Sequence, residues 1–368
     1  MKSFKTPLPV YVHNIPSPSL LVFPDRVEEN VDRMIRMVDG EIERLRPHVK
    51  THKMSEVVSL QVAKGITRFK CATIAEAEMT ALSGGRDVLL SHQPVGPNVA
   101  RFLALQAIFP EVTFSTIVDS EKVVESFVAT GKPARLFVDL DCGMHRTGVD
   151  PEDGALSLCR RIAESEHLEF AGLHAYDGHL HQPDLSERTE AHAAAIKSWS
   201  GLIESLKEEN LSPPAIVIGG SPTFGLNAKT EWQCSPGTTL FWDVGYGRSF
   251  PDLDFECAAF LLTRIISKPG KDRLCLDLGH KAVAAEKPID KRAWFPDLSE
   301  ARPLLQSEEH FVLECPNAED FSVGDALLAV PWHICPTVAL HHEAHLVRDG
   351  KVSGETWKVA ARNRILSI

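Results

Sequence analysis

Short apolar runs alternate with longer amphipathic stretches along the first 250 residues of the chain. The short runs suit strands buried on both faces, and the longer stretches repeat their apolar residues at helical spacing. Strands are predicted at Leu45–Lys50, Phe69–Ala72, Asp87–Ser91, Thr113–Val118, Arg135–Leu140, Phe170–Tyr176, Ala215–Gly219 and Thr238–Val244. Helices are predicted near Ser55–Lys64, Ile74–Leu82, Val99–Ala107, Glu121–Thr130, Pro151–Glu164 and Glu187–Glu208. Eight strands separated by helices predict an α/β fold of the (β/α)₈ barrel type.

The chain before this pattern predicts one more strand and one more helix. The strand is Ser19–Phe23, and the helix begins after Asp25, with Glu28 at the spacing of a capping box. A doubly wound sheet is the alternative for the first half of the chain. That fold would want a Gly-x-Gly-x-x-Gly turn after its first strand, and this chain has none there.

Beyond about residue 250 the pattern changes to short strands separated by turn residues. The predicted strands are Phe255–Ile266, Asp272–Asp277, His310–Leu313, Ala326–Val330, Ala344–Arg348 and Glu355–Val359. We therefore expect a barrel over residues 15–250 and a mainly β domain over residues 251–368. Residues 1–14 are too few to form a domain alone and are expected to join the β domain.

Composition and charge narrow the class of protein. The chain is 43% hydrophobic and has a net charge of −11, which disfavours a nucleic-acid surface. No apolar run approaches the roughly 20 residues that span a membrane, and the start lacks the apolar core of a secretory signal. The eight cysteines include no Cys-x-x-Cys pair, so reduced thiols and a cytoplasmic location are expected.

The end of the first predicted strand carries a cluster of basic and imidazole groups. Alternation along an extended segment places Arg46, His48 and Lys50 on one face. A lysine at the end of a buried strand loses its proton more readily and then serves as an amine nucleophile. A solvated basic loop is the alternative interpretation of this segment. Lys281, in the predicted β domain, is the other candidate lysine.

Further polar residues follow the fifth and sixth predicted strands, at the end where barrel active sites lie. Arg146 lies in Gly-Met-His-Arg-Thr-Gly, and an ion pair with a nearby aspartate is its alternative role. Alternation places His174 and Tyr176 toward the barrel interior. His179 and His181 fall on the following loop, where either is a candidate general base, or a surface histidine without a role.

Two glycine turns near the end of the predicted barrel are candidates for binding a phosphate. Backbone N–H groups in such turns bind anions, and many barrels build a phosphate site from the loops after strands seven and eight. The candidates are Gly220, Ser221, Gly237 and Thr238.

A third candidate site lies in the predicted β domain, where His333-Ile-Cys335 occurs on a segment that we expect to be extended. Imidazole and thiolate are ligands suited to zinc. A purely structural role is the alternative, and two ligands alone leave the site incomplete. The nearby His341, His342 and His345 are interpreted as polar residues at a strand end, with a second metal site as the alternative.

These motifs resemble the D-threonine aldolase and D-serine dehydratase family, which are pyridoxal-phosphate enzymes of the alanine-racemase fold. The segments that carry the resemblance are 46–53, 143–148 and 331–337. The resemblance implies that Lys50 binds the cofactor covalently, that Arg146 lies beside its phenolic oxygen, and that Tyr176 contacts it. The resemblance also implies that Gly220, Ser221, Gly237 and Thr238 form a phosphate-binding cup. It raises the expectation of a metal on His333 and Cys335. Some family members have a carboxylate where Cys335 stands, so zinc and manganese are both candidates, with magnesium and cobalt as further options.

The expected function is that of a metal-assisted pyridoxal-phosphate lyase acting on D-β-hydroxy-amino acids. The lead reaction is cleavage of D-threonine to glycine and acetaldehyde. Dehydration of D-serine with the same groups is the nearest alternative, and an amino-acid racemase or a cofactor carrier without turnover is more distant. The expected partner is a small D-amino acid, and the resemblance implies a homodimer.

Overall fold

The computed structural model describes residue 4 and residues 6–368, and contacts group them into two compact units. The first unit holds the described residues up to Arg33, together with Thr51–Val57 and Thr238–Arg362. The second holds Met34–Lys50, Val58–Gly237 and Asn363–Ile368. We call the first the β unit and the second the barrel unit. Among the described helices, none has the length and apolar character needed to cross a membrane.

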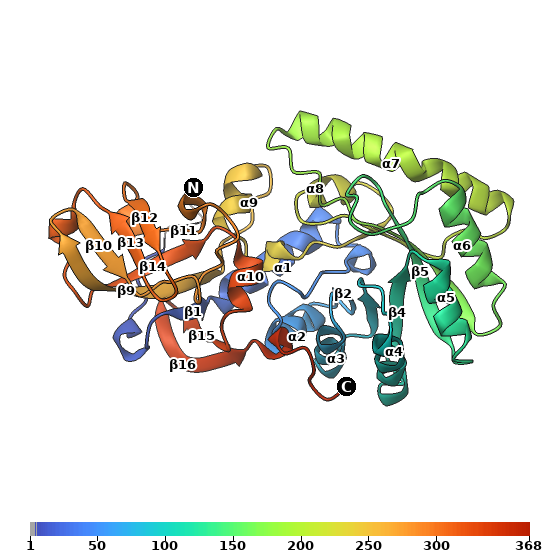
Figure 1. Cartoon of the computed structure of the whole chain (residues 1–368), viewed down its shortest axis with the longest axis horizontal. Helices are drawn as coiled ribbons and strands as arrows, with labels where there is room; N and C mark the ends of the chain where they lie inside the picture. Colours follow the sequence, from blue (N-terminus) through green and yellow to red (C-terminus); the bar gives the residue numbers. More distant parts are fainter. Residues whose placement is uncertain (1–3, 5) are drawn as a thin grey trace. The chain divides into compact units, whose positions relative to one another are not determined.

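A curled parallel sheet of seven described strands forms the centre of the barrel unit, in sequential order from β2 to β8 (Figure 1). The strands are Arg68–Cys71 (β2), Asp87–Leu90 (β3), Thr113–Val118 (β4), Ala134–Leu140 (β5), Leu168–Ala175 (β6), Ile216–Ile218 (β7) and Gln233–Cys234 (β8). The connecting helices are Ser55–Ala63 (α2), Ile74–Leu82 (α3), Pro97–Ile108 (α4), Glu121–Val128 (α5), Asp153–Ala163 (α6), Leu185–Glu208 (α7) and Phe224–Asn227 (α8). The helix predictions up to Glu208 are therefore confirmed to within a few residues.

The segment predicted as the first strand closes this sheet, although only two of its residues form ladder bridges. Leu45 bridges Cys234 of β8, and His48 bridges Lys70 of β2, both in parallel. The backbone N–H of His48 also donates to the carbonyl of Pro236 at 2.8 Å. One short segment thus joins the last strand to the first and completes a barrel.

The prediction for the last strand of the barrel is wrong. Thr238–Val244 is not a strand, because Thr238–Leu240 forms a 3-10 turn and Val244–Ser249 forms helix α9. The carboxylate of Asp243 caps α9 by accepting a hydrogen bond from the N–H of Tyr246 at 2.9 Å. The apolar run is buried, but burial alone does not distinguish a strand from a short turn of helix. The eighth strand is the two-residue β8.

Helix α1 (Pro24–Met37) begins two residues earlier than predicted. Pro24 is its first residue, a position that suits the fixed φ of proline. Asp25 therefore lies in the first turn, where a carboxylate interacts favourably with the helix N-terminus, and not at the cap.

The β unit is built on a sheet of nine described strands, mostly antiparallel (Figure 1). Its main path runs β12-β13-β10-β9-β1-β15-β16, and β14 pairs with both β9 and β11. The strands are Ser19–Val22 (β1), Ala259–Gly270 (β9), Arg273–Leu276 (β10), Ala293–Trp294 (β11), Arg302–Gln306 (β12), Phe311–Glu314 (β13), Ala326–Pro331 (β14), Glu343–Arg348 (β15) and Lys351–Lys358 (β16). All six strands predicted beyond residue 250 are present. β11 is too short for a periodic signal, and β12 is largely exposed.

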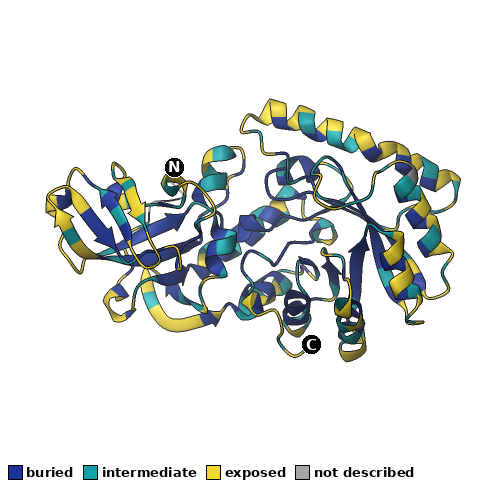
Figure 2. Ribbon diagram, in the orientation of Figure 1, coloured by how far each residue is buried: buried dark blue, intermediate teal, exposed yellow. Residues whose placement is uncertain are grey.

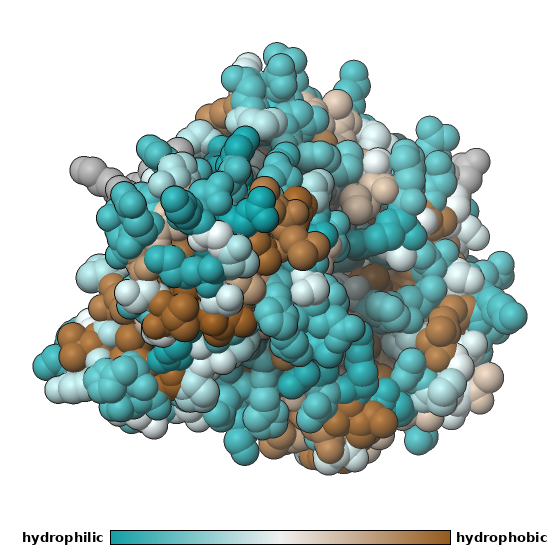
Figure 3. Space-filling model, turned by 60° about the vertical axis from the view of Figure 1, so that its left-hand side comes forward, coloured by the Kyte–Doolittle hydropathy of each residue, from teal (hydrophilic) through white to brown (hydrophobic). Residues whose placement is uncertain are grey.

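Side chains from five neighbouring strands form an apolar cluster inside the barrel unit. The cluster consists of Leu89, Ile117, Phe137, Ala171 and Val217, all nearly or fully buried. Figure 2 shows the same burial along the strands, while the outer faces of α5, α6 and α7 are exposed. On the face of the molecule drawn in Figure 3, apolar side chains form separate patches among polar ones. Ile117 also lines the cavity described below, so this cluster supports its wall.

A buried ion pair fastens the closing segment to the sheet. Arg46 donates from Nη1 and Nη2 to the two carboxylate oxygens of Asp87, each at 2.8 Å, and from Nε to Gln233 at 2.7 Å. The Arg46 side chain is 2% exposed and that of Asp87 is 26% exposed. Burial raises the pKa of Asp87, but the hydrogen bonds and charge of Arg46 outweigh burial and lower this pKa below its usual value.

Replacing Arg46 by methionine should lower the free energy of unfolding by about 3 kcal/mol, because Asp87 would keep its charge without its partner. Urea unfolding of purified protein measures this. Arg135→Met is the matched control: Arg135 pairs with Glu169 at 2.8 Å, and the two side chains are 33% and 57% exposed. The control should cost less than about 1 kcal/mol, and equal losses in the two variants would contradict the prediction.

The same pair predicts how stability depends on pH. The folded-state pKa of Asp87 is depressed, so its contribution is present above the unfolded value of about 3.9 and is lost as pH falls through the folded value. The difference in free energy of unfolding between the wild type and Arg46→Met should therefore shrink as the pH falls into the acid range, as measured by urea unfolding at each pH.

Candidate active site

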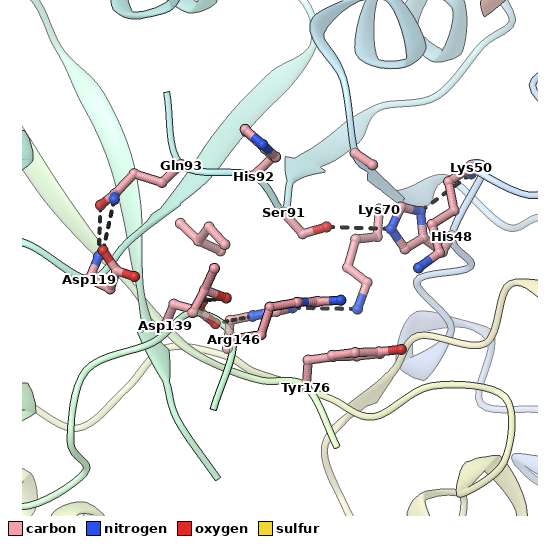
Figure 4. Close-up of a pocket in the computed structure, with 14 residues that line it drawn as sticks. His48, Lys50, Lys70, Ser91, His92, Gln93, Asp119, Asp139, Arg146 and Tyr176 are labelled. Atoms are coloured by element: carbon pink, nitrogen blue, oxygen red, sulfur yellow. Dashed lines mark hydrogen bonds and ion pairs between the residues drawn. The ribbon is translucent and has the colours of Figure 1, made fainter. Parts of the chain in front are cut away.

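A cavity of about 510 Å³ lies in the barrel unit, lined by residues at or just beyond the carboxyl ends of its strands. Figure 4 shows that its wall combines several cations with two aspartates, Asp119 and Asp139. Asp119 is held by the side-chain amide of Gln93, which donates to its carboxylate at 2.7 Å and accepts from its backbone N–H at 2.8 Å. The predicted residues Lys50, Arg146, His174 and Tyr176 all line this one cavity.

Lys50 enters the cavity from a turn at the end of the closing segment. Its backbone N–H donates to Nδ1 of His48 at 3.4 Å, and Nε2 of His48 lies 3.4 Å from Oγ of Ser91. Nζ of Lys50 lies 5.6 Å from the ring centroid of Tyr176. The predicted alternation holds for His48 and Lys50, whereas the more deeply buried Arg46 binds Asp87 and is not part of the cavity wall.

The loop that carries Arg146 is shaped by Asp141. One oxygen of this carboxylate accepts from the backbone N–H groups of Gly143 and His145, and the other lies 2.8 Å from Nδ1 of His145. The Arg146 guanidinium lies 4.8 Å from the centroid of the Tyr176 ring (Figure 4). Asp141 therefore orders the loop through Gly143 and His145, whereas the Arg146 guanidinium stacks on the Tyr176 ring.

A buried chain of polar groups crosses the cavity floor. Nδ1 of His174 lies 2.6 Å from Asp139, and Nε2 lies 3.4 Å from Nζ of Lys70. The hydroxyl of Thr147 donates to the second oxygen of Asp139 at 2.9 Å. Burial lowers the pKa of His174, and burial also lowers the pKa of Lys70, to about 7. Sequence reasoning missed Lys70, although a lysine inside the short buried strand β2 was a signal that could have identified it.

The two loops predicted to bind phosphate lie side by side. The N–H of Gly237, which follows β8, donates to the hydroxyl of Ser221, which follows β7, at 3.1 Å. A Cβ on Gly220 would come within 3.2 Å of the Tyr176 ring, so this loop contacts the cavity's central aromatic residue. In the same loop as Gly237, the buried hydroxyl of Ser235 has no hydrogen-bond partner within the described part of the chain.

A phosphorylated ring cofactor therefore fits the barrel unit. A backbone N–H and two serine hydroxyls gather in adjacent loops, a guanidinium lies over an aromatic ring, and an amine enters the same cavity. Thr238, the fourth residue of the predicted cup, belongs to the β unit, where its hydroxyl lies 3.5 Å from the sulfur of Cys335.

His179 and His181 are not part of the described cavity wall. The imidazole of His179 packs on Gly143, where an added Cβ would come within 2.8 Å of Nε2. His181 is exposed on the surface. Their role as general base stays a prediction from the sequence.

The predicted metal ligands meet at the end of β14. His333 has extended backbone angles, but Cys335 lies in the short helix α10 (Ile334–Val338), so the segment is not extended throughout. The two side chains nevertheless share a hydrogen bond. The sulfur of Cys335 also lies 3.1 Å from the hydroxyl of Thr51. The turn into the helix thus brings the imidazole and the thiol together.

Electrostatics favours a thiolate at this position. Burial raises the pKa of Cys335, but the hydrogen bond and charge of His333 outweigh burial and hold it below its usual value. Burial lowers the pKa of His333, yet Cys335 and Glu286 raise it to about 9. Nδ1 of His333 lies 2.6 Å from Glu286. A divalent cation fits such a pair, because it would replace the shared proton between a thiolate and an oriented imidazole.

Asp243 fixes the backbone of this segment. Its second carboxylate oxygen accepts from the N–H of Ile334 at 3.0 Å. Among the described residues no group of three or more His, Cys, Asp or Glu side chains gathers as a complete metal site.

Two other candidates from the sequence have ordinary partners. His341 donates to the carbonyl of Ala282 at 2.8 Å, and Lys281 lies in an exposed ion pair with Glu308.

Most of the chain matches two protein-family models. Residues 22–243 match the family model described as alanine racemase, N-terminal domain, and residues 258–347 match the putative serine dehydratase domain. The chain is 30% identical to a D-threonine aldolase from Arthrobacter sp., over 95% of this chain and 93% of that protein.

Two solved structures share the fold. The crystal structure of D-threonine aldolase from Filomicrobium marinum has a TM-score of 0.88 and 27% identity, and it covers 97% of this chain and 98% of its own. A D-threo-3-hydroxyaspartate dehydratase mutant in a metal-free form has a TM-score of 0.78 and 22% identity, with 94% of this chain and 98% of its own covered. The alanine-racemase-like fold predicted from the sequence is therefore confirmed.

Replacing Glu286 by glutamine should weaken binding of zinc or manganese about 10- to 100-fold, because a carboxylate that orients a ligating imidazole contributes this much to metal affinity. Titration against a competing chelator measures the affinity. Glu308→Gln, which removes a carboxylate only from the exposed pair with Lys281, should bind metal like the wild type. Unchanged affinity in Glu286→Gln would count against a metal on His333.

Proposed function

The chain belongs to the alanine racemase N-terminal domain family, alongside D-threonine aldolases and D-serine dehydratases, and we propose that it is a pyridoxal-phosphate- and divalent-metal-dependent lyase of D-β-hydroxy-amino acids. The lead reaction is the aldol cleavage of D-threonine to glycine and acetaldehyde. The observation that supports it best is the single cavity that gathers Lys50, Arg146, His174 and Tyr176. A homodimeric state is part of the same proposal.

The chain's own residues divide the work of holding the cofactor. Lys50 would bind it covalently, Arg146 would face its ring, and the loops at Ser221 and Gly237 would take the phosphate. When bound, pyridoxal phosphate withdraws electrons from Cα of an amino acid, so that a bond at Cα breaks more easily. Tyr176 would keep the ring in place, because it touches the phosphate loop at Gly220 and stacks with Arg146.

His333 and Cys335 would hold the metal, with Glu286 orienting the imidazole. A bound divalent metal polarises an oxygen ligand such as a hydroxyl group. Two protein ligands leave open coordination positions, as catalytic sites require and as structural zinc sites do not. The D-threo-3-hydroxyaspartate dehydratase of the same fold, with its metal-free form, supports a metal requirement here.

Dehydration of D-serine or of D-threo-3-hydroxyaspartate is the second candidate function. The serine dehydratase domain matched at residues 258–347 favours it specifically. Cleavage and dehydration differ in which bond at Cα is broken. Both use a β-hydroxyl group, and this is why the same donor set suits either reaction.

Borohydride reduction after addition of pyridoxal phosphate should attach one cofactor to the peptide that contains Lys50, because this amine lies in the cavity at a loop end. Peptide mass spectrometry identifies the site. Lys50→Ala should lose the label, and Lys281→Ala, which alters an exposed lysine, should keep it. A label on Lys53, Lys70 or Lys281 in the wild type would overturn the assignment of Lys50.

Incubation with D-threonine, D-serine and D-threo-3-hydroxyaspartate should distinguish the candidate reactions by their products. Aldol cleavage gives glycine with acetaldehyde, formaldehyde or glyoxylate from D-threonine, D-serine or D-threo-3-hydroxyaspartate. Dehydration of the same substrates gives ammonia with 2-oxobutanoate, pyruvate or oxaloacetate. We expect acetaldehyde from D-threonine. Absence of every product with cofactor and metal supplied would reject the proposed function.

Chelation by EDTA should abolish this activity and leave the melting temperature nearly unchanged, since a chain of this size buries enough apolar surface to fold without metal. His333→Ala should not be rescued by added metal. Unfolding of the chelated wild type would instead indicate a structural metal.

A further inference from the structure

Lys70 occupies a position where a lysine is costly. It lies on β2, is 2% exposed, and extends its amine into the cavity above the Tyr176 ring, 5.7 Å from the centroid (Figure 4). Transfer of an ammonium group from water to such a site costs several kcal/mol unless it is compensated. An apolar side chain would fill the same volume without this cost, so the amine itself requires an explanation.

The partners of Lys70 define its hydrogen bonding. Asp139 accepts from Nδ1 of His174, because a neutral imidazole beside a carboxylate keeps its proton on that nitrogen. Nε2 then carries a lone pair, and it faces Nζ of Lys70 at 3.4 Å. Thr147 holds the other oxygen of Asp139. The chain Asp139–His174–Lys70 is therefore arranged to stabilise a proton on the amine when one arrives.

The charges around Lys70 are nearly balanced. Burial lowers its pKa to about 7, and Lys50 and Arg46 lower it as well, while Asp177 and Asp139 raise it. The amine is therefore partly neutral near neutral pH. The charged or titratable groups that line the cavity with Lys70 are His48, Lys50, His92, Asp119, Asp139, Arg146, His174 and Tyr176. Arg46 and Asp177 act on it from outside the cavity wall.

We propose that Lys70 is the acid–base group of this cavity, whose neutral amine takes the hydroxyl proton of the bound D-β-hydroxy-amino acid. The O–H bond breaks, an N–H bond forms at Nζ, and the electron pair left on oxygen becomes the carbonyl bond as Cα–Cβ breaks. The electron pair of the broken Cα–Cβ bond stays on Cα. Lys70 returns the proton to Cα, so atoms and charge balance without any further reactant. This role rests on the proposed function.

Lys70 meets the geometric requirement for a base better than the two histidines suggested by the sequence. A base must reach the proton that it removes. Lys70 lines the cavity, whereas His179 and His181 are not part of its described wall. His48, which does line it, is engaged by the Lys50 N–H and by Ser91.

The titration of Lys70 is measured on the wild-type chain without cofactor, independently of turnover. Lysine labelled with ¹³C at Cε gives one signal per residue, and the signal missing in Lys70→Met identifies Lys70. We expect that signal to titrate near pH 7, and at lower pH in Asp139→Asn, because this variant lacks the carboxylate that stabilises the ammonium. Titration near the ordinary value of about 10.4 would overturn the proposal whatever the enzyme's activity.

Turnover of the cofactor-loaded, metal-loaded enzyme tests the catalytic role. Lys70→Met should lower kcat about 10²- to 10⁴-fold, the usual contribution of a general acid–base group, with melting temperature and cofactor absorbance unchanged. Lys70→Arg should be equally impaired, since a guanidinium does not give up its proton. Lys281→Met, a surface control, should keep full activity. In the wild type, kcat should rise with pH through the titration of Lys70.

The possible failures are distinguishable. Activity of Lys70→Met within about threefold of the wild type would exclude the base role. Full activity in Lys70→Arg would show that only the positive charge matters and would also exclude it. Absence of turnover in the wild type on every substrate would reject the proposed function, and a Lys70 titration near pH 7 would then still establish a protonating group in the cavity.

Discussion

Closure of the barrel by the segment Leu45–Lys50 is the constraint on which the rest of the barrel unit depends. This segment bridges β8 through Leu45 and β2 through His48. Arg46 binds Asp87 from within it, and the chain turns directly afterwards, so Lys50 is delivered to the cavity. A backbone hydrogen-bonded on both sides has little freedom, and this is why a lysine so near its end can be placed reproducibly.

The second consequence of closure is a concentration of positive charge in a small volume. The amines of Lys50 and Lys70 and the guanidinium of Arg146 all lie within 6 Å of the Tyr176 ring centroid. Cations this close destabilise one another in a partly dry site, and Asp139 and Asp177 offset part of that repulsion. Such a cavity favours an anionic ligand. Burial lowers the pKa of Lys70 to about 7.

The β unit places an imidazole and a thiol side by side on a short turn. Asp243 caps α9 and also binds the backbone of Ile334, so one buried carboxylate fixes the approach to both helices. Burial raises the pKa of Asp243 to about 6. Glu286 orients His333 from outside the turn. In the His-x-Cys motif, His333 follows the end of β14 and Cys335 lies at the start of α10, and this change of backbone direction brings the two side chains together.

Local patterns in the sequence determined a large part of this protein. Periodicity alone located most strands and helices, since it reports which faces are buried. The segment around Lys50, the loop of Arg146, and Tyr176 were recognisable because they follow buried strands, and the ends of parallel strands meet in a barrel. Tertiary structure decided what periodicity does not encode. The run Thr238–Val244 is as apolar as a buried strand. It nevertheless forms a 3-10 turn and the start of α9, and Asp243 caps that helix. Lys70 falls within a predicted strand, but its partners His174 and Asp139 come from β6 and β5. Residues far apart in the chain create that environment, so only the folded barrel reveals it.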